Sequence, residues 1–201
     1  PRVHYSISDF VPRPDQSIRS RGTIERPARG WLETIEWAIE ARVNMLISAP
    51  TGVGKTSLLR AMLRHKRFAG ERLFIAEQTP ELWAASPNVV YAREAEGVGM
   101  DQLIGYALRA APACIIVGEV RYPPEAVQLV LAMQTGHSGS VATIHGGTAG
   151  GGRRRLATLC RGELPREIVE ESFPLVVQMC VNEHGERVIC EMIFEDERVR
   201  Q

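Results

Sequence analysis

A glycine-rich segment set between a strand pattern and a helix pattern constrains this chain more than any other feature. The segment, with its flanking alanine and serine, consists of Ala49, Pro50, Thr51, Gly52, Val53, Gly54, Lys55, Thr56 and Ser57. It fits the phosphate-binding loop pattern, with alanine in place of the usual leading glycine. Residues 43–48 before it predict a buried strand, and Leu58, Leu59, Met62 and Leu63 after it give a helix an apolar face. Strand, loop and helix in this order predict a nucleoside triphosphate site.

The residue types in the loop each suit a phosphate. Gly52 and Gly54 let the backbone turn so that successive N–H groups point at phosphate oxygens, and the dipole of the following helix favours negative charge. Lys55 can reach the β- and γ-phosphates, and the Thr56 hydroxyl can ligate Mg²⁺. We therefore expect ATP and Mg²⁺ as cofactors and residues 50–57 as the segment that binds them.

Strand and helix patterns alternate through most of the chain. Strands are predicted at residues 72–77, 88–91, 113–117 and 140–144, and helices at residues 27–39, 100–108, 123–133 and 165–173. Such alternation indicates an α/β fold, a mostly parallel sheet with helices on both faces. Residues 176–181 and 187–194 predict a closing β-hairpin. Residues 3–10 predict a short strand with a linker after it, and residues 146–152 a glycine-rich loop that runs into Arg153, Arg154 and Arg155.

The charge and the cysteine content limit the classes of function that the chain can have. Lys plus Arg and Asp plus Glu both number 24, so the formal net charge of zero supplies no global field for nucleic acid. The arginine triplet could hold phosphate or nucleic acid, or open a solvated helix; we expect no direct nucleic-acid binding. No apolar run approaches the ~18 residues of a membrane span. The four cysteines show no C-x-x-C pairing, so we expect reduced, mostly buried thiols of a cytoplasmic protein and no zinc site.

Two carboxylates stand near the ends of predicted strands, where a doubly wound sheet binds its ligand. Glu119 follows the strand at 113–117, in the position from which a Walker B carboxylate holds Mg²⁺ through water, and Glu77 ends the strand at 72–77. Together they supply a metal holder and a candidate general base. Each could instead be a helix N-cap or a surface acid.

Two histidines and two arginines complete the candidate site. His137 and His145 bracket the strand at 140–144 and suit a γ-phosphate sensor or a role at a subunit interface. Arg93 and Arg121 are cations near the same sheet edge, and their spacing leaves open whether they serve this chain's nucleotide or a neighbour's.

Taken together, these segments resemble the type II/type IV secretion ATPases, which power pilus assembly and conjugative transfer. Residues 75–82 resemble the family's Asp box, residues 93–99 its arginine-and-glycine segment, residues 108–121 the Walker B box with its approach, and residues 132–145 the His box. The resemblance runs from about residue 3 to residue 195. Without the tetracysteine zinc insertion of the type II branch, the chain is most similar to the tight-adherence pilus and conjugation ATPases.

The resemblance implies a RecA-like P-loop motor domain over residues 27–201, preceded at 1–26 by the end of an N-terminal domain and a linker. It implies ATP hydrolysis in a hexameric ring, with Glu77 as general base, Glu119 assisting Mg²⁺, and the His box around His137 and His145 coupling nucleotide state to movement. Implied partners are further copies of the chain and the inner-membrane platform proteins of a secretion, pilus-assembly or conjugation machine, at the cytoplasmic face of the membrane. Because that family builds its ring partly from the N-terminal domain, we expect residues 1–201 alone to associate weakly.

Several positions depart from the family pattern. They are Ala49 in the loop, Gln78 in place of the Asp-box aspartate, Ala111 and Ala113 before Walker B, Tyr122 after it, and Gly146 with Gly147 after His145. Gln78 removes one carboxylate from the metal neighbourhood. Two other functions therefore stay open: a non-hydrolysing nucleotide-binding assembly subunit, and a nucleic-acid motor or small-molecule kinase on the same fold.

Overall fold

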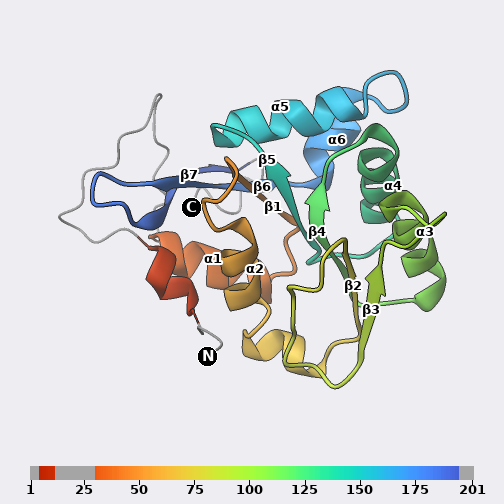
Figure 1. Ribbon diagram of the computed structural model, residues 1–201, viewed down its shortest axis with the longest axis horizontal. Helices are drawn as coiled ribbons and strands as arrows, with labels where there is room; N and C mark the ends of the chain where they lie inside the picture. The colour runs from red at the N-terminus through yellow and green to blue at the C-terminus, as the bar shows by residue number, and fades with distance from the viewer. Residues whose placement is uncertain (1–4, 12–29, 195–201) are drawn as a thin grey trace.

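One seven-stranded sheet organises the part of the chain that the computed structural model describes, residues 5–11 and 30–194 (Figure 1). Its strand order is β3-β2-β4-β5-β1-β6-β7. The strands are β1 (Met45–Ala49), β2 (Leu73–Glu77), β3 (Val89–Arg93), β4 (Cys114–Val120), β5 (Val141–His145), β6 (Leu175–Val181) and β7 (Arg187–Phe194). All pairings are parallel except that of β6 with β7, the predicted closing hairpin. The expected mostly parallel sheet is confirmed.

Helices cover both faces of this sheet (Figure 1). α1 (Trp31–Glu40) and α2 (Lys55–Met62) pack on one face, and α3 (Met100–Ala110), α4 (Pro123–Gln134), α5 (Ala149–Leu159) and α6 (Arg166–Ser172) on the other. Successive strand residues point to opposite layers, so Met45 and Ile47 join the first apolar core while Leu46 joins the second. Burial on both faces explains why the central strands read as continuous apolar runs.

Strand direction decides where the functional residues meet. In β1 and β5, which run parallel, Ala49 is in register with His145, so the phosphate-binding loop after β1 emerges beside the end of β5. Glu77 is the last residue of β2, on the other side of β4. The carboxyl ends of four neighbouring strands therefore share one edge, as ligand sites in open α/β sheets do.

The structure corrects the predicted end of β4. The strand was expected to stop before Gly118 and Glu119, but it continues through both to Val120, with a register shift against β5 between Val117 and Val120. Gly118 allows this close packing, because a Cβ added there would lie 3.2 Å from the Cβ of Glu77. The Thr143 hydroxyl donates a hydrogen bond to the Gly118 carbonyl over 2.6 Å. Glu119 is thus held within the sheet edge and not on a loop.

The glycine-rich stretch at 146–152 is also corrected, since its second half is the start of α5. The helix begins at Ala149, and the Thr148 side chain caps it by accepting a hydrogen bond from the Gly151 N–H over 2.9 Å. Glycine is a poor helix former, but here it permits close packing on β1. A Cβ added to Gly152 would lie 2.4 Å from the Ser48 Oγ and 2.7 Å from its Cβ. Tertiary contact therefore overrides local propensity.

We expect Gly152→Ala to lower the free energy of unfolding by about 1–3 kcal/mol, because the added methyl group overpacks the contact with Ser48. Urea denaturation followed by circular dichroism measures this. Gly147→Ala is the matched control, since no atom lies within 4 Å of a Cβ added there. Equal stability of the two variants would contradict the packing account.

The strand predicted at residues 3–10 is wrong where the structure describes it. Ile7–Phe10 form a short 3-10 helix, η1, in which the Ser6 N–H donates to the Asp9 carboxylate over 2.7 Å. This local side-chain bond competes with strand pairing. Ile7 and Phe10 are buried in the core that includes α2. The helix expected from residue 27 begins at Trp31 among the described residues, and residue 27 itself lies outside them.

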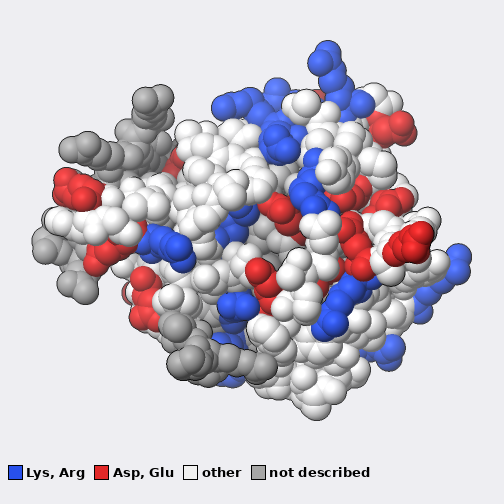
Figure 2. Space-filling model, in the orientation of Figure 1, with Lys and Arg blue, Asp and Glu red and all other residues white. Residues whose placement is uncertain are grey.

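Charge is distributed unevenly over the face that carries the strand ends. Figure 2 shows Lys and Arg gathered over α5, which contains Arg153, Arg154 and Arg155, while positive and negative side chains alternate around the middle of the view.

Cys114, Cys160 and Cys190 are buried and Cys180 is partly exposed, as expected of mostly buried thiols. None of the helices in the described residues is long and apolar enough to span a bilayer.

Candidate nucleotide site

A cavity of about 510 Å³ lies above the N-terminus of α2, at the shared edge of the strands. Its walls come from the phosphate-binding loop, the ends of β2, β4 and β5, and the start of β7. It is lined by Thr51, Gly52, Gly54, Lys55, Thr56, Ser57, Arg60, Glu77, Gln78, Thr79, Glu81, Leu82, Met100, Gly118, Glu119, Arg121, Thr143, His145 and Arg187. The predicted loop thus borders the cavity through most of its residues, whereas Pro50 and Val53 do not line it.

The loop conformation requires its glycines. Gly52 has φ 77° and Gly54 has φ 103°, in the left-handed region that side-chain-bearing residues rarely adopt. Gly54 is also the N-cap residue of α2, and Lys55 is the first residue of the helix. Ala49, in contrast, is the buried last residue of β1, so alanine fits where the loop pattern usually has glycine. The backbone can therefore present its N–H groups at a helix N-terminus, the arrangement that binds anions.

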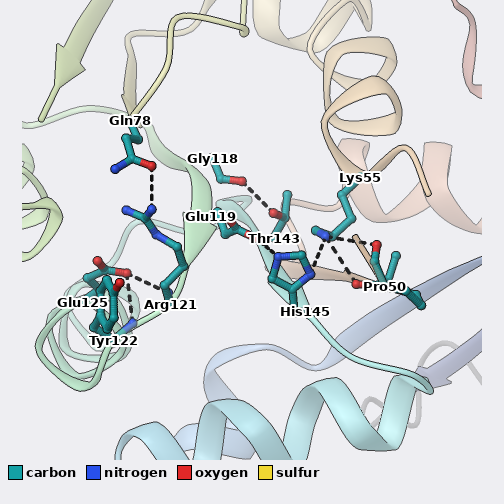
Figure 3. A network of polar contacts seen from close by, with 11 residues as sticks. Pro50, Lys55, Gln78, Gly118, Glu119, Arg121, Tyr122, Glu125, Thr143 and His145 are labelled. Carbon is teal, nitrogen blue, oxygen red and sulfur yellow. Dashed lines mark hydrogen bonds and ion pairs between the residues drawn. The ribbon is translucent and has the colours of Figure 1, made fainter. Parts of the chain in front are cut away.

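Lys55 is held beneath the cavity by three acceptors (Figure 3). Its Nζ lies 3.3 Å from the Ala49 carbonyl oxygen, 3.4 Å from that of Pro50 and 3.0 Å from the His145 Nδ1. The side chain is nearly buried, with 8% of the residue exposed. Burial lowers the pKa of Lys55, and the charge of Glu119 opposes that shift.

His145 connects this lysine to a carboxylate. An ammonium group only donates, so the Nδ1 of His145 accepts from Lys55 and the ring proton sits on Nε2. Nε2 lies 2.6 Å from the Glu119 Oε1, to which it donates. Lys55, His145 and Glu119 thus form one hydrogen-bonded row across the ends of β5 and β4 (Figure 3).

Glu77 has one oxygen fixed and the other free. It is only 3% exposed, and its Oε2 accepts from the backbone N–H groups of Glu81 at 2.8 Å and Leu82 at 3.0 Å. Its Oε1 is buried and has no hydrogen-bond partner among the described residues. A surface acid would not show this burial. An unpartnered carboxylate oxygen at a cavity wall is costly unless a ligand or water uses it.

Arg121 is restrained by polar groups from three segments. Its Nη1 donates to the Gln78 Oε1 over 2.5 Å, and its Nη2 lies 3.2 Å from the Glu94 Oε2. The backbone N–H of Arg121 donates to the Glu125 Oε2 over 2.7 Å, which fixes the turn before α4 (Figure 3). Burial raises the pKa of Glu125, and the hydrogen bonds from the backbone N–H groups of Arg121 and Tyr122 oppose the shift. Gln78 therefore orients an arginine where the family pattern has a carboxylate.

Besides Pro50 and Val53, two further predicted residues do not reach this cavity. His137 precedes the amino end of β5, the opposite end of the strand from His145, and its Nδ1 lies 3.1 Å from the Ala132 carbonyl oxygen. Arg93 ends β3, which is the outermost strand on its side of the sheet, and its side chain is exposed. Within one chain, neither residue lines the space beside the loop.

The structure adds lining residues that the sequence did not single out. Arg60 lies one turn further along α2, donates to the Glu81 carbonyl, and has its guanidinium carbon 5.2 Å from the centre of the Trp83 ring. Thr143 comes from β5, inside the predicted His box. Arg187 comes from the closing hairpin, and no motif marks it.

The donor set fits a magnesium nucleotide. The Thr56 hydroxyl and the carboxylates of Glu77 and Glu119 are the hard oxygen ligands that Mg²⁺ prefers, and the loop with Lys55 suits phosphate oxygens. Among the described residues, no three or more His, Cys, Asp or Glu side chains gather as a metal site.

Comparison with known proteins places this geometry in context. The family described as "Type II/IV secretion system protein" matches residues 21–195. The "Probable conjugal transfer protein TrbB" of Sinorhizobium fredii is 38% identical over 179 residues, which cover 87% of this chain and 54% of that relative. The chain spans about half the length of the curated relatives that it matches.

Solved structures show the same architecture. The VirB11 ATPase of the Brucella suis type IV secretion system, in complex with sulphate, superimposes with a TM-score of 0.74 at 26% identity, over 84% of this chain and 53% of that one. The pilus retraction motor PilT with bound ADP superimposes with a TM-score of 0.73 over 100% of this chain and 56% of its own. At 19% identity, the second likeness concerns the fold alone.

Proposed function

Because the chain belongs to the type II/IV secretion system protein family, we propose that it is an ATP-hydrolysing motor of a secretion, pilus-assembly or conjugation machine. The observation that carries the proposal is the convergence of the loop, Lys55, Glu77 and Glu119 on one cavity. A binding protein would need the loop and the lysine alone. The buried, unpartnered oxygen of Glu77 adds a group suited to activating water.

Each group has a defined task in this proposal. The loop N–H groups and Lys55 bind the β- and γ-phosphates, and the Thr56 hydroxyl with Glu119, the latter through water, holds Mg²⁺, which neutralises charge on the phosphate oxygens. Glu77 is the general base, since two backbone N–H groups fix one of its oxygens and leave the other for a water proton. Charge stabilisation and positioning supply most of the catalysis in phosphoryl transfer.

His145 links nucleotide binding to the Glu119 side of the cavity. Lys55 hydrogen-bonds to His145, so a phosphate that attracts Lys55 competes with the imidazole. The Nε2–H of His145 remains available to Glu119 when that bond breaks. We propose that this exchange of partners reports nucleotide occupancy to β5, the strand that carries the His box.

Assembly and location are proposals for the whole protein, because the chain spans about half of its curated relatives. We propose a ring of identical subunits, hexameric as the family resemblance implies, that acts with inner-membrane platform proteins at the cytoplasmic face of the membrane. Arg93 is exposed on the outermost strand and lies outside its own chain's cavity, which suits contact with a neighbouring subunit. The roles predicted for His137 stay predictions, since the residue is buried within its own subunit and lies outside the cavity.

Steady-state release of phosphate from ATP, measured with and without Mg²⁺, tests the proposal. We expect Mg²⁺-dependent hydrolysis by the full-length protein, and by residues 1–201 a lower rate. Tight nucleotide binding without turnover in the full-length protein would favour the non-hydrolysing assembly subunit. Gln78 supports that alternative because it removes one carboxylate from the metal neighbourhood. Stimulation of turnover by DNA or RNA would favour a nucleic-acid motor.

A further inference from the structure

Arg187, the first residue of β7, is a cavity-lining cation that none of the roles above uses. The other arginines and the lysine that line the cavity are already engaged: Lys55 by His145, Arg60 by the Glu81 carbonyl, and Arg121 by Gln78. Within residues 5–11 and 30–194, the guanidinium of Arg187 makes no hydrogen bond or ion pair. Among the cations that line the cavity, Arg187 is therefore the one whose guanidinium donors have no partner in the described residues.

The stem of Arg187 packs against the phosphate-binding loop. A Cβ added to Gly54 would lie 3.1 Å from the Arg187 Cδ and 3.9 Å from its Cβ. The guanidinium begins at the atom bonded to Cδ, so its base is held next to the residue that precedes Lys55. Met179 of β6 also approaches this glycine, with its terminal methyl 3.7 Å from the same point. The closing hairpin thus packs against the loop at Gly54 through Met179 and Arg187, and Arg187 supplies the charge in this contact.

The side chain is free to turn toward a ligand. Arg187 is exposed, and it lines both this cavity and a second one between the hairpin and η1, so open space adjoins the side chain on two sides. A triphosphate brings several negative charges into a cavity whose lining already includes the carboxylates of Glu77, Glu81 and Glu119. A free cation at the loop would offset part of that charge. Guanidinium presents its donors in a planar fork that matches two phosphate oxygens.

We infer that Arg187 binds the phosphate chain of the nucleotide, as a second cation that the C-terminal hairpin supplies beside Lys55. The inference rests on the proposed function, because it takes a nucleotide as the ligand. It extends that function by making the hairpin part of the binding site. Nucleotide binding would then join β7 and the loop through their shared contact with the phosphates.

Calorimetric titration of the full-length protein with ATP, ADP and pyrophosphate tests the inference. We expect Arg187→Ala to weaken all three by about 10-fold or more, the usual range for a hydrogen bond to a charged group. Arg187→Lys should fall between the alanine variant and the parent, since it keeps the charge but loses the fork. His184→Ala is the matched control: it alters the exposed turn of the same hairpin, lines neither cavity, and should bind like the parent.

The outcomes separate this inference from the proposed function. A parent protein that binds no nucleotide would refute the proposed function whatever Arg187 does. A parent that binds, with an Arg187→Ala variant of equal affinity for all three ligands, would overturn the inference alone. Loss of ATP and ADP affinity with unchanged pyrophosphate affinity would assign Arg187 to the nucleoside and so refute the phosphate contact. Should the alanine variant not fold, Arg187→Gln decides by the same comparison.

Discussion

Lys55→Ala abolishes tight ATP binding in the proposed site, and this is the largest effect that we expect. The Nζ of Lys55 lies beneath the loop, within hydrogen-bond distance of the Ala49 carbonyl, the Pro50 carbonyl and His145. No other cation of the loop can reach the β- and γ-phosphates. Loss of one partner of a buried, hydrogen-bonded charge pair typically costs about 2–5 kcal/mol of binding free energy, which is a roughly 30-fold to several-thousand-fold loss of affinity.

Calorimetric titration with ATP in the presence of Mg²⁺ measures the effect. Lys66→Ala is the matched control, since Lys66 is the only other lysine in the sequence and its side chain is 86% exposed. It should bind ATP like the parent. Unchanged affinity in the Lys55→Ala variant would refute the assignment of the loop as the phosphate-binding site, and with it the proposed ATPase.

Glu77→Gln is expected to leave Mg-ATP binding largely intact while turnover falls by roughly 10²-fold or more, as for the loss of a general base. The amide oxygen of glutamine can still accept from the N–H groups of Glu81 and Leu82, so the loop after β2 keeps its anchor. The amide cannot take a proton from water. Binding and catalysis should therefore separate in this variant.

Glu119→Gln provides the comparison. It should also lower turnover, but with a stronger dependence on Mg²⁺ concentration, since the proposed task of Glu119 is to hold the metal through water. Phosphate release at several Mg²⁺ concentrations distinguishes the two variants. If Glu77→Gln hydrolyses ATP at the parent rate, the general base lies elsewhere, and Glu119 is the next candidate.

The sequence alone predicted the parts of the protein that short-range chemistry specifies. The loop at 50–57 was identified because glycine, lysine and threonine at that spacing answer the needs of a phosphate. Continuous apolar runs predicted the strands, since a parallel sheet buries both faces. The positions of Glu77 and Glu119 near strand ends then predicted that they would share a sheet edge, and both line the same cavity.

Other features depended on contacts between distant segments. His137 lies before β5 and His145 is its last residue, and only the carboxyl end of β5 meets the loop. Residues 149–152 are helical in spite of their glycines, because Gly152 packs against Ser48 of β1. Local pattern could not reveal either outcome, since each is set by the strand or helix that lies alongside.

Sequence by itself thus determined the fold class and predicted the loop and the carboxylates of the candidate site, because each is encoded by residue type and spacing within one segment. Tertiary structure decided which side chains meet. It joined Lys55 to Glu119 through His145, paired Arg121 with Gln78, and set the stem of Arg187 against Gly54. These contacts cross the sheet between segments far apart in the chain, and only the packing of the strands sets their distances.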